Sequence, residues 1–158
     1  MLLEKKEVLS VPAGKSYPCI EANSIHACPD TTAYSYKPAQ YITFRKPGGI
    51  MERLYEIKHI IVFNPYDVTE VAQLAEKYKT RVQNYINDRM REWPFDDRNP
   101  RRFYLLSKGS SEGTIELPHK PQMPKNSSGH CYYTIAALTS GKKIVEIASR
   151  QTTDLTSM

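Results

Sequence analysis

Three residues in the first half of the chain have the types and spacing of a metal-dependent phosphodiesterase site. Asp30 follows Pro29, and Glu56 and Lys58 flank Ile57 in a predicted strand. Two carboxylates would hold Mg²⁺, and the lysine would orient or deprotonate the attacking water. Side chains two residues apart in a strand point to the same face, so Glu56 and Lys58 meet the geometry that this chemistry needs.

These residues formally match the PD-(D/E)xK nuclease pattern, and a Mg²⁺-dependent nuclease is therefore one alternative function. Two observations weigh against it. The spacing of Glu56 and Lys58 is common on a solvated strand face, and residues 1–28, where the pattern expects a helix, do not look helical. Catalysis is therefore not the favoured prediction, and no catalytic residue is assigned outside this alternative.

Basic and aromatic residues interleave around the predicted strands, which favours a nucleic-acid-binding surface. Arginine offers a planar fork to phosphate, and aromatic rings offer stacking platforms for unpaired bases. The residues expected to hold phosphates are Arg45, Lys58, Arg98, Arg101 and Arg102, and those expected to contact bases or line the pocket are Tyr41, Tyr132 and Tyr133. The neighbouring acids Glu92, Asp96 and Asp97 partly cancel the arginine cluster, so a solvated, internally paired surface is the competing interpretation.

The cysteines and histidines do not predict a metal site. Cys19, His26 and Cys28, with His59 or His119 as a fourth ligand, lack the tight Cys-x-x-Cys or Cys/His pairs that zinc sites show. Gly48 and Gly49 lack the lysine and helix that follow in a phosphate-binding loop. We predict no metal and no cofactor.

Composition bounds the class of protein. The chain has 158 residues, a net charge of +5, 11 tyrosines, 11 prolines and three cysteines. The length favours one domain over residues 1–158, with an ordered core at about 7–148 and a polar C-terminal tail. Three widely spaced cysteines and an early charged segment favour a reducing cytoplasm, and no apolar run is long enough to span a membrane. The positive charge permits an anionic partner.

The strand pattern comes from alternating apolar residues and turn signals. We expect strands at 7–12, 40–45, 102–107, 114–117, 131–134 and 143–148, and a long strand or bent pair at 50–63. Lys46-Pro47-Gly48-Gly49 is a turn, because the glycines accept positive φ and proline fixes the entry. Residues 13–38 are expected to be irregular, with at most a short helical turn or strand at 20–27. Thr134 is expected to cap a short helix that ends at Leu138.

One amphipathic helix is expected over residues 68–92. Apolar residues recur with 3–4 spacing from Val71 through Tyr78, Tyr85 and Trp93, and the aromatic ones are expected in the core. Asp67 and Glu70 form a capping-box pattern at its start. Several short strands and one long helix, without regular βαβ alternation, predict an α+β domain with a mostly antiparallel sheet.

The predicted hairpin resembles one found in PUA-like domains. Tyr41-Ile42-Thr43-Phe44-Arg45, the Gly-Gly turn, Ile50 and Leu54-Tyr55-Glu56-Ile57 carry the resemblance, and scattered later motifs extend it over about residues 8–148. The later motifs are Arg102–Leu106, Leu117–Pro121, Tyr132–Thr134 and Lys143-Ile144. The resemblance is to the EVE, YTH and ASCH groups and to small modules of bacterial restriction or defence-type proteins. It implies a strongly bent sheet or pseudo-barrel and binding of RNA or DNA, often around a modified base.

The favoured function is therefore a non-enzymatic PUA-like domain that binds DNA or RNA, as a modified-base reader in a restriction or defence context. The nuclease is one alternative. A protein-interaction module is the other, favoured if the basic residues are dispersed or internally paired. No membrane partner is expected, and the sequence does not predict an oligomeric state.

Overall fold

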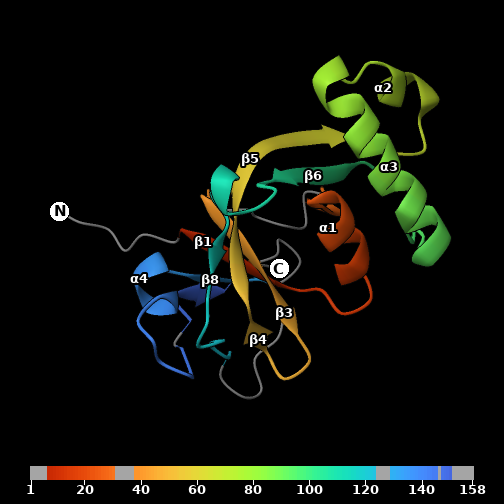
Figure 1. The fold of residues 1–158 in the computed structure, drawn as a ribbon. Coiled ribbons are helices and arrows are strands. Elements are labelled where there is room, and N and C mark those ends of the chain that lie inside the picture. Colours follow the sequence, from red (N-terminus) through yellow and green to blue (C-terminus); the bar gives the residue numbers. More distant parts are fainter. Residues whose placement is uncertain (1–6, 31–37, 124–128, 146, 151–158) are drawn as a thin grey trace. The chain divides into compact units, whose positions relative to one another are not determined.

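The computed structural model has an α+β fold and describes residues 7–30, 38–123, 129–145 and 147–150 (Figure 1). The α+β prediction is confirmed. The chain groups into two compact units, one of residues 1–14, 32–57 and 107–158 (unit 1) and one of residues 15–31 and 58–106 (unit 2). The single domain expected over residues 1–158 stays a prediction.

Unit 1 is built on a mixed sheet. Its strands are β1 (Val8–Pro12), β3 (Tyr41–Lys46), β4 (Ile50–Met51), the first part of β5 (Arg53–Phe63), β7 (Ile115–Glu116), β8 (Cys131–Tyr133) and β9 (Ser149–Arg150). The order is β5-β3-β1-β8-β9, with β4 beside β3 and β7 beside β5. β1 and β3 are parallel, with Leu9 opposite Ile42, and the other pairs given for this unit are antiparallel. The first and last strands of this order are not paired with each other among the described residues. The pseudo-barrel prediction is therefore corrected to an open, mixed sheet.

The predicted hairpin is present in unit 1. Gly48 and Gly49 have φ values of 86° and 77°, and the amide of Gly49 donates to the carbonyl oxygen of Lys46 at 2.9 Å. Met51 and Leu54 are fully buried beside Val8 and Tyr133, which gives the unit its core. The alternation of apolar residues in this part of the sequence therefore predicted the correct pairing.

The C-terminal part of unit 1 follows the prediction as far as residue 138. Thr134 Oγ1 accepts a hydrogen bond from the amide of Ala137 at 3.1 Å and caps α4 (Ile135–Leu138), as predicted. A 3₁₀ turn, η1, covers Ser110–Glu112. The strand expected at 143–148 is wrong: Ile144 forms a single bridge with Gln122, and β9 begins at Ser149.

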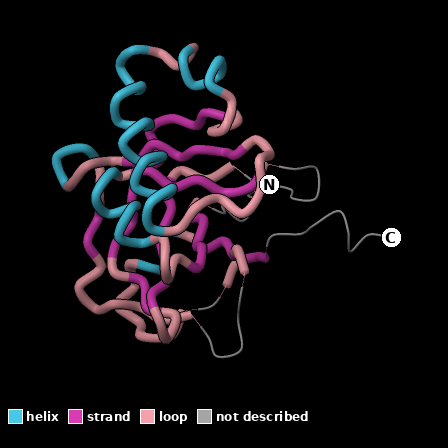
Figure 2. Tube along the Cα trace, turned by 90° about the vertical axis from the view of Figure 1, so that its right-hand side faces the viewer, coloured by secondary structure: helices cyan, strands magenta, loops and turns pink. Residues whose placement is uncertain are grey.

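Unit 2 packs helices on a small sheet. It contains α1 (Tyr17–Asn23), β2 (Ile25–Pro29), the end of β5, α2 (Val68–Ala72), α3 (Glu76–Glu92) and β6 (Arg101–Leu106). β6 lies between β2 and β5. Figure 2 draws the helices of the chain in cyan and its strands in magenta. The core joins Ala27 and Phe103 of the sheet to Val82 and Tyr85 of α3, and Phe63 stacks on Phe103 with ring centroids 4.3 Å apart.

The segment at 13–38, expected to be irregular apart from a short helical turn or strand at 20–27, is more regular than predicted, since α1 and β2 both lie within residues 17–29. Pro18 does not break α1, because it lies in the first turn, where a helix does not need the missing N–H. Ser24 then ends the helix with a left-handed conformation, φ 53°, and β2 follows at once. The remaining part of the expected segment, residues 31–37, lies outside the described residues.

The single helix expected at 68–92 is two helices. α2 ends at Ala72, and α3 begins at Glu76 after Ala75, whose ψ of 137° is extended. Asp67 caps α2 by accepting from the amides of Thr69 and Glu70, as predicted, but Glu70 accepts from the amide of Asn64 and does not reach back to Asp67. No glycine or proline marks residues 73–75, so the local sequence gives no sign of the break.

The aromatic residues of the expected stripe differ in burial. Tyr85 is fully buried, as predicted, and Tyr78 is half-buried and stacks on His59 at 4.8 Å. Trp93 is 43% exposed, which corrects its assignment to the core. No helix in the described part of the chain is long and apolar enough to cross a membrane.

Candidate nucleic-acid interface

Arg45 is the predicted phosphate-binding residue with the most defined surroundings. It lies near the end of β3, opposite Pro12 of β1, and is 6% exposed. Its Nη1 donates to the carbonyl oxygen of Ser10 at 2.8 Å and to Ser10 Oγ at 2.7 Å, and its Nη2 donates to the carbonyl oxygen of Gly129. These three acceptors are uncharged and fix the orientation of the guanidinium.

A pocket of about 340 Å³ lies beside Arg45 in unit 1. Most of its lining side chains are small or flat, and the exceptions are two cations and a methionine. The lining residues are Pro12, Ala13, Gly14, Arg45, Lys46, Pro47, Gly49, Met123 and Gly129. A Cβ added at Gly14 or Gly129 would meet no atom within 4 Å, so the space beside both glycines is open. The two cations and the small side chains make this pocket suitable for an anionic group.

Lys46 carries the second positive charge of this pocket. Its Nζ lies 2.8 Å from Glu52 Oε1, and Lys120 Nζ lies 4.0 Å from Glu52 Oε2. The hydrogen bond from Lys46 holds the pKa of Glu52 below its ordinary value, and the charges of Lys46 and Lys120 add to this effect. One carboxylate is thus shared by two lysines beside the turn.

The tyrosines expected to contact bases lie differently from the prediction. Tyr132 and Tyr133 are fully buried in β8, where they pair with Leu9 and Val8 of β1. A fully buried ring offers no face to a base, and the role of these two residues in lining a pocket stays a prediction. Tyr41 is half-buried on β3, opposite Glu56.

The arginine cluster of unit 2 is largely paired with acids. Arg101 is buried, and its Nη2 lies 2.5 Å from Asp96 Oδ1 and 3.2 Å from Asp97 Oδ1. The hydrogen bond from Arg101 lowers the pKa of Asp96. Arg102 Nε lies 3.1 Å from Asp30 Oδ1. These two arginines therefore serve the fold of unit 2 first. The neighbouring acids in the sequence indicated this for Arg101, whereas the partner of Arg102 is distant in the sequence.

Arg98 and Lys58 are the exposed members of the predicted set in unit 2. The guanidinium of Arg98 lies over the Tyr66 ring, 4.6 Å from its centroid, and the Arg98 carbonyl oxygen accepts from Asn64 Nδ2. Such a cation–π contact orders a side chain that would otherwise be mobile. Lys58 is exposed on β5. Both are accessible to a phosphate.

The nuclease alternative gains no support from Asp30. This carboxylate is half-buried and bound to Arg102, and its unit also holds Lys58, whereas Glu56 belongs to unit 1. Glu56 packs against Gly113, where an added Cβ would come within 2.5 Å of Glu56 Oε1. Across the described ranges no group of three or more His, Cys, Asp or Glu residues could hold a metal ion.

Sequence reasoning missed most of the pocket lining. Gly14, Gly129 and Met123 come from three distant segments, and each alone looks like a turn or a core residue. The available signal was indirect: Arg45 and Lys46 stand directly before a Pro-Gly-Gly turn, where a buried cation requires acceptors from elsewhere in the chain.

Comparison with models of known families found no match, and neither did comparison with curated proteins. Among solved structures the chain is similar to one described as "Crystal structure of ASCH from Zymomonas mobilis". The two are 10% identical, the alignment covers 89% of this chain and 99% of that chain, and the TM-score is 0.45. ASCH is one of the PUA-like groups to which the sequence resemblance points. A TM-score below 0.5 carries no argument about function, which therefore has to come from the chain's own residues.

Proposed function

We propose that this protein binds nucleic acid and that a phosphate of the bound strand lies at the Arg45 pocket. The observation that supports the proposal is the guanidinium of Arg45, oriented by Ser10 and Gly129 at the wall of a pocket that Lys46 also lines. Guanidinium and ammonium groups are the side chains that bind phosphate oxygens best. Burial reduces screening by water and salt, so a charge at this wall acts more strongly than one at the open surface.

Unit 2 has exposed cations of its own that can contact phosphates, independently of the Arg45 pocket. Arg98 is ordered by Tyr66, and Lys58 has a long flexible stem that can follow an irregular strand. Contacts of this kind give affinity without reading sequence. We therefore expect binding to depend strongly on salt and weakly on base sequence.

The sequence analysis also predicts, more specifically, that the protein recognises a modified base. It requires a ring or a flat face beside the base. The lining residues given for the Arg45 pocket offer Pro12, Pro47 and Met123 as flat or soft apolar contacts and include no aromatic ring among the described residues. The proposal is therefore confined to nucleic-acid binding, and a restriction or defence context would come from partners of this protein.

The test is fluorescence anisotropy with labelled 12-nucleotide DNA and RNA, single- and double-stranded, in low salt. The informative variant is Gly14→Leu, because residue 14 has open space around it and does not have a positive φ, so leucine fills the pocket without strain. Wild-type protein should bind with a Kd of tens of micromolar or tighter, and Gly14→Leu should weaken binding roughly tenfold.

Ala136→Leu is the matched control, since it adds the same side chain at an exposed position of α4 away from the pocket lining. It should bind as the wild type does. Absence of binding to every oligonucleotide would remove the proposed function. Binding that Gly14→Leu leaves unchanged would remove the Arg45 pocket from it.

A further inference from the structure

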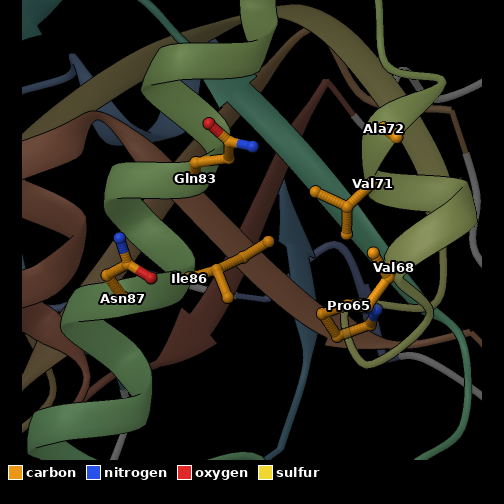
Figure 3. A pocket seen from close by; sticks show the side chains of 7 residues that line it. All are labelled: Pro65, Val68, Val71, Ala72, Gln83, Ile86 and Asn87. Atoms are coloured by element: carbon orange, nitrogen blue, oxygen red, sulfur yellow. The ribbon is translucent and has the colours of Figure 1, made fainter.

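The groove between α2 and α3 of unit 2 and the Arg45 pocket of unit 1 differ in charge. None of the seven side chains that line the groove is ionisable (Figure 3), so the groove offers no charge to a phosphate backbone. The Arg45 pocket has two cations in its lining, Arg45 and Lys46. Control of phosphate binding is therefore expected at the Arg45 pocket, and Glu52 is the acid that contacts its lysine.

Glu52 lies between β4 and β5, and its backbone is held by the segment that runs beside it. The amide of Leu117 donates to the carbonyl oxygen of Glu52 at 2.9 Å, and the amide of Met51 donates to the carbonyl oxygen of Pro121 at 2.9 Å. These two hydrogen bonds bring the turn that contains Lys120 beside Glu52. The backbone thus places the carboxylate near Lys120, in addition to the ion pairs that the carboxylate itself makes.

Lys120 has a backbone conformation that lysine rarely adopts. Its φ is 48°, and its amide donates to the carbonyl oxygen of Leu117 at 2.9 Å, which closes a tight turn. A residue with a Cβ adopts this left-handed region at a cost that glycine does not have. Strained residues of this kind gather at ligand-binding and switch regions. The side chain of Lys120 is exposed, and its Nζ lies 4.0 Å from Glu52 Oε2.

Lys46 connects Glu52 to the pocket. It lines the pocket, and its Nζ lies 2.8 Å from Glu52 Oε1. Because the pKa of Glu52 lies below its ordinary value, chiefly through this hydrogen bond, the carboxylate is ionised at neutral pH. Arg53, the other cation beside Glu52, has a carboxylate of its own, since its Nε lies 3.0 Å from Glu116 Oε2. Before a strand binds, Lys46 and Lys120 are therefore both ion-paired with Glu52.

We propose that Glu52 is an internal competitor for Lys46 and Lys120, which the phosphates of a bound strand have to displace. This inference rests on the proposed function and names the residue that regulates it. A carboxylate and a phosphate form the same kind of charge-assisted hydrogen bond with an ammonium group, and two anions at one ammonium repel each other. The strand displaces Glu52 at low salt, because neutralised phosphates release condensed counterions, a gain that an isolated carboxylate does not provide. Glu52 thus lowers the affinity of the site for nucleic acid.

Glu52→Gln tests the proposal, since glutamine keeps the size and an acceptor oxygen of the side chain but not its charge. In the anisotropy assay with labelled single-stranded DNA, this variant should lower the Kd about threefold to fivefold, because partly exposed ion pairs of modest strength no longer have to be broken.

Glu116→Gln is the matched control. It removes the same charge from the ion pair with Arg53, and neither residue is among the described residues that line the pocket. It should change the Kd less than twofold. Urea denaturation shows that both variants are folded.

Two further measurements separate competition from a general effect of charge. In a Lys46→Gln, Lys120→Gln background, Glu52→Gln should change the Kd less than twofold, because no lysine remains to be released. The slope of log K against log salt should be the same for Glu52→Gln as for the wild type, since the same phosphate contacts form in both complexes. If the lysines instead stayed on Glu52 in the wild-type complex, the variant would gain two contacts and its slope would be steeper by about 1.4.

The outcomes distinguish this inference from the proposed function. Wild-type binding that Glu52→Gln leaves unchanged or weakens would make Glu52 a positioning residue for the lysines and would overturn the inference alone. Tighter binding that persists in the double lysine background, or a steeper slope, would also overturn it. Absence of binding by the wild type and by Glu52→Gln would remove the proposed function itself.

Discussion

Besides the phosphate contact proposed for it, Arg45 has a structural role, because its hydrogen bonds hold two segments of unit 1. Its guanidinium satisfies the carbonyl oxygens of Ser10 and Gly129, which lie in β1 and just before β8. A buried acceptor that loses its donor costs more than the hydrogen bond itself contributed. Substitutions of Arg45 therefore test stability, which is why the functional test uses Gly14 instead.

We expect Arg45→Leu to lower the free energy of unfolding by about 3 kcal/mol, since it removes the buried donor that the carbonyl oxygens of Ser10 and Gly129 share. Arg45→Lys keeps the charge but cannot reproduce the fork, and should lie between the leucine variant and the wild type. Urea denaturation with a constant slope is the measurement. An Arg45→Leu midpoint equal to that of the wild type would show that these hydrogen bonds do not stabilise unit 1.

Asp88 makes the stability of unit 2 depend on acid pH. Asn23 Nδ2 donates to Asp88 Oδ2 at 2.8 Å and Arg91 Nη2 donates to Asp88 Oδ1 at 2.7 Å, and these hydrogen bonds lower the pKa of Asp88 in that order of importance. A pKa that is lower in the folded state means that the carboxylate stabilises the fold above about pH 4. This stabilisation is lost as the pH falls through the folded-state pKa.

The predicted consequence is a pH-dependent difference between the wild type and Asp88→Asn. The wild type should be more stable by about 1 kcal/mol or less at pH 6, and the difference should shrink toward zero between pH 4 and pH 3. Urea denaturation across this range measures it. Glu76→Gln, which alters an exposed pair with Lys79, is the comparison variant and should show a smaller change. A difference that grows on acidification would contradict the assignment.

At the level of elements, the break between α2 and α3 creates the groove. Leu74 turns into the core of unit 2, and Ala75 takes an extended conformation, φ −58° and ψ 137°, at the N-cap of α3. No side-chain hydrogen bond caps α3 at this residue. In an unbroken helix residues 73–75 would be helical, and residue 76 would lie in the helix interior and not at a helix start.

The sign of one substitution distinguishes the two arrangements. Ala75→Ser supplies the missing cap and should raise the free energy of unfolding by about 0.5–1 kcal/mol. In the continuous helix that the sequence predicts, the same serine would lie in the helix interior. It would then lower the free energy of unfolding by about a few tenths of a kcal/mol. Chemical denaturation reads the sign directly. Asp67→Ala, which removes the existing cap of α2, should lower the stability by about 1 kcal/mol and serves as the reference.

The elements differ in how far the sequence predicts them. The hairpin at 41–57 follows from local rules, because Gly48 and Gly49 carry the positive φ values and alternating apolar residues fix the register. The break at 73–75 depends on where Leu74 packs, a tertiary fact with no local signal, so periodicity extended the helix through it. The same reason explains Trp93: it has the right spacing for the core, but it lies at the C-cap of α3 and remains exposed.

The candidate site likewise contains residues that the sequence predicts and residues that it does not. Arg45 and Lys46 could be proposed from the sequence, because cations beside a glycine turn are a recognisable pattern. Their pocket could not, because it joins the end of β1, the hairpin turn and the segments at 123 and 129. The buried positions of Tyr132 and Tyr133 follow from the pairing of β8 with β1, which no short-range pattern in this part of the sequence predicts.

At the scale of the whole molecule, the positive charge is unevenly divided between the two units. By sequence, unit 1 has 12 Lys and Arg against 8 Asp and Glu, and unit 2 has 10 against 9. The excess that gives the net charge of +5 therefore lies mainly in the unit that holds the Arg45 pocket. In unit 2, most arginines of the predicted cluster have acidic partners.

This division predicts which cations determine the salt dependence of oligonucleotide binding. Lys46→Gln with Lys120→Gln removes two charges beside the pocket turn, and Lys58→Gln with Arg98→Gln removes two exposed charges from unit 2. Each phosphate contact contributes about 0.7 to the slope of log K against log salt for a single strand, so loss of two contacts should reduce the slope by about 1.4. We expect that reduction for the unit 1 pair and a smaller one for the unit 2 pair. Anisotropy titrations between 20 and 200 mM salt measure both slopes. A larger reduction for the unit 2 pair would assign the phosphate contacts to Arg98 and Lys58 and not to the Arg45 pocket. The reason is that the salt dependence reports which cations the bound strand neutralises.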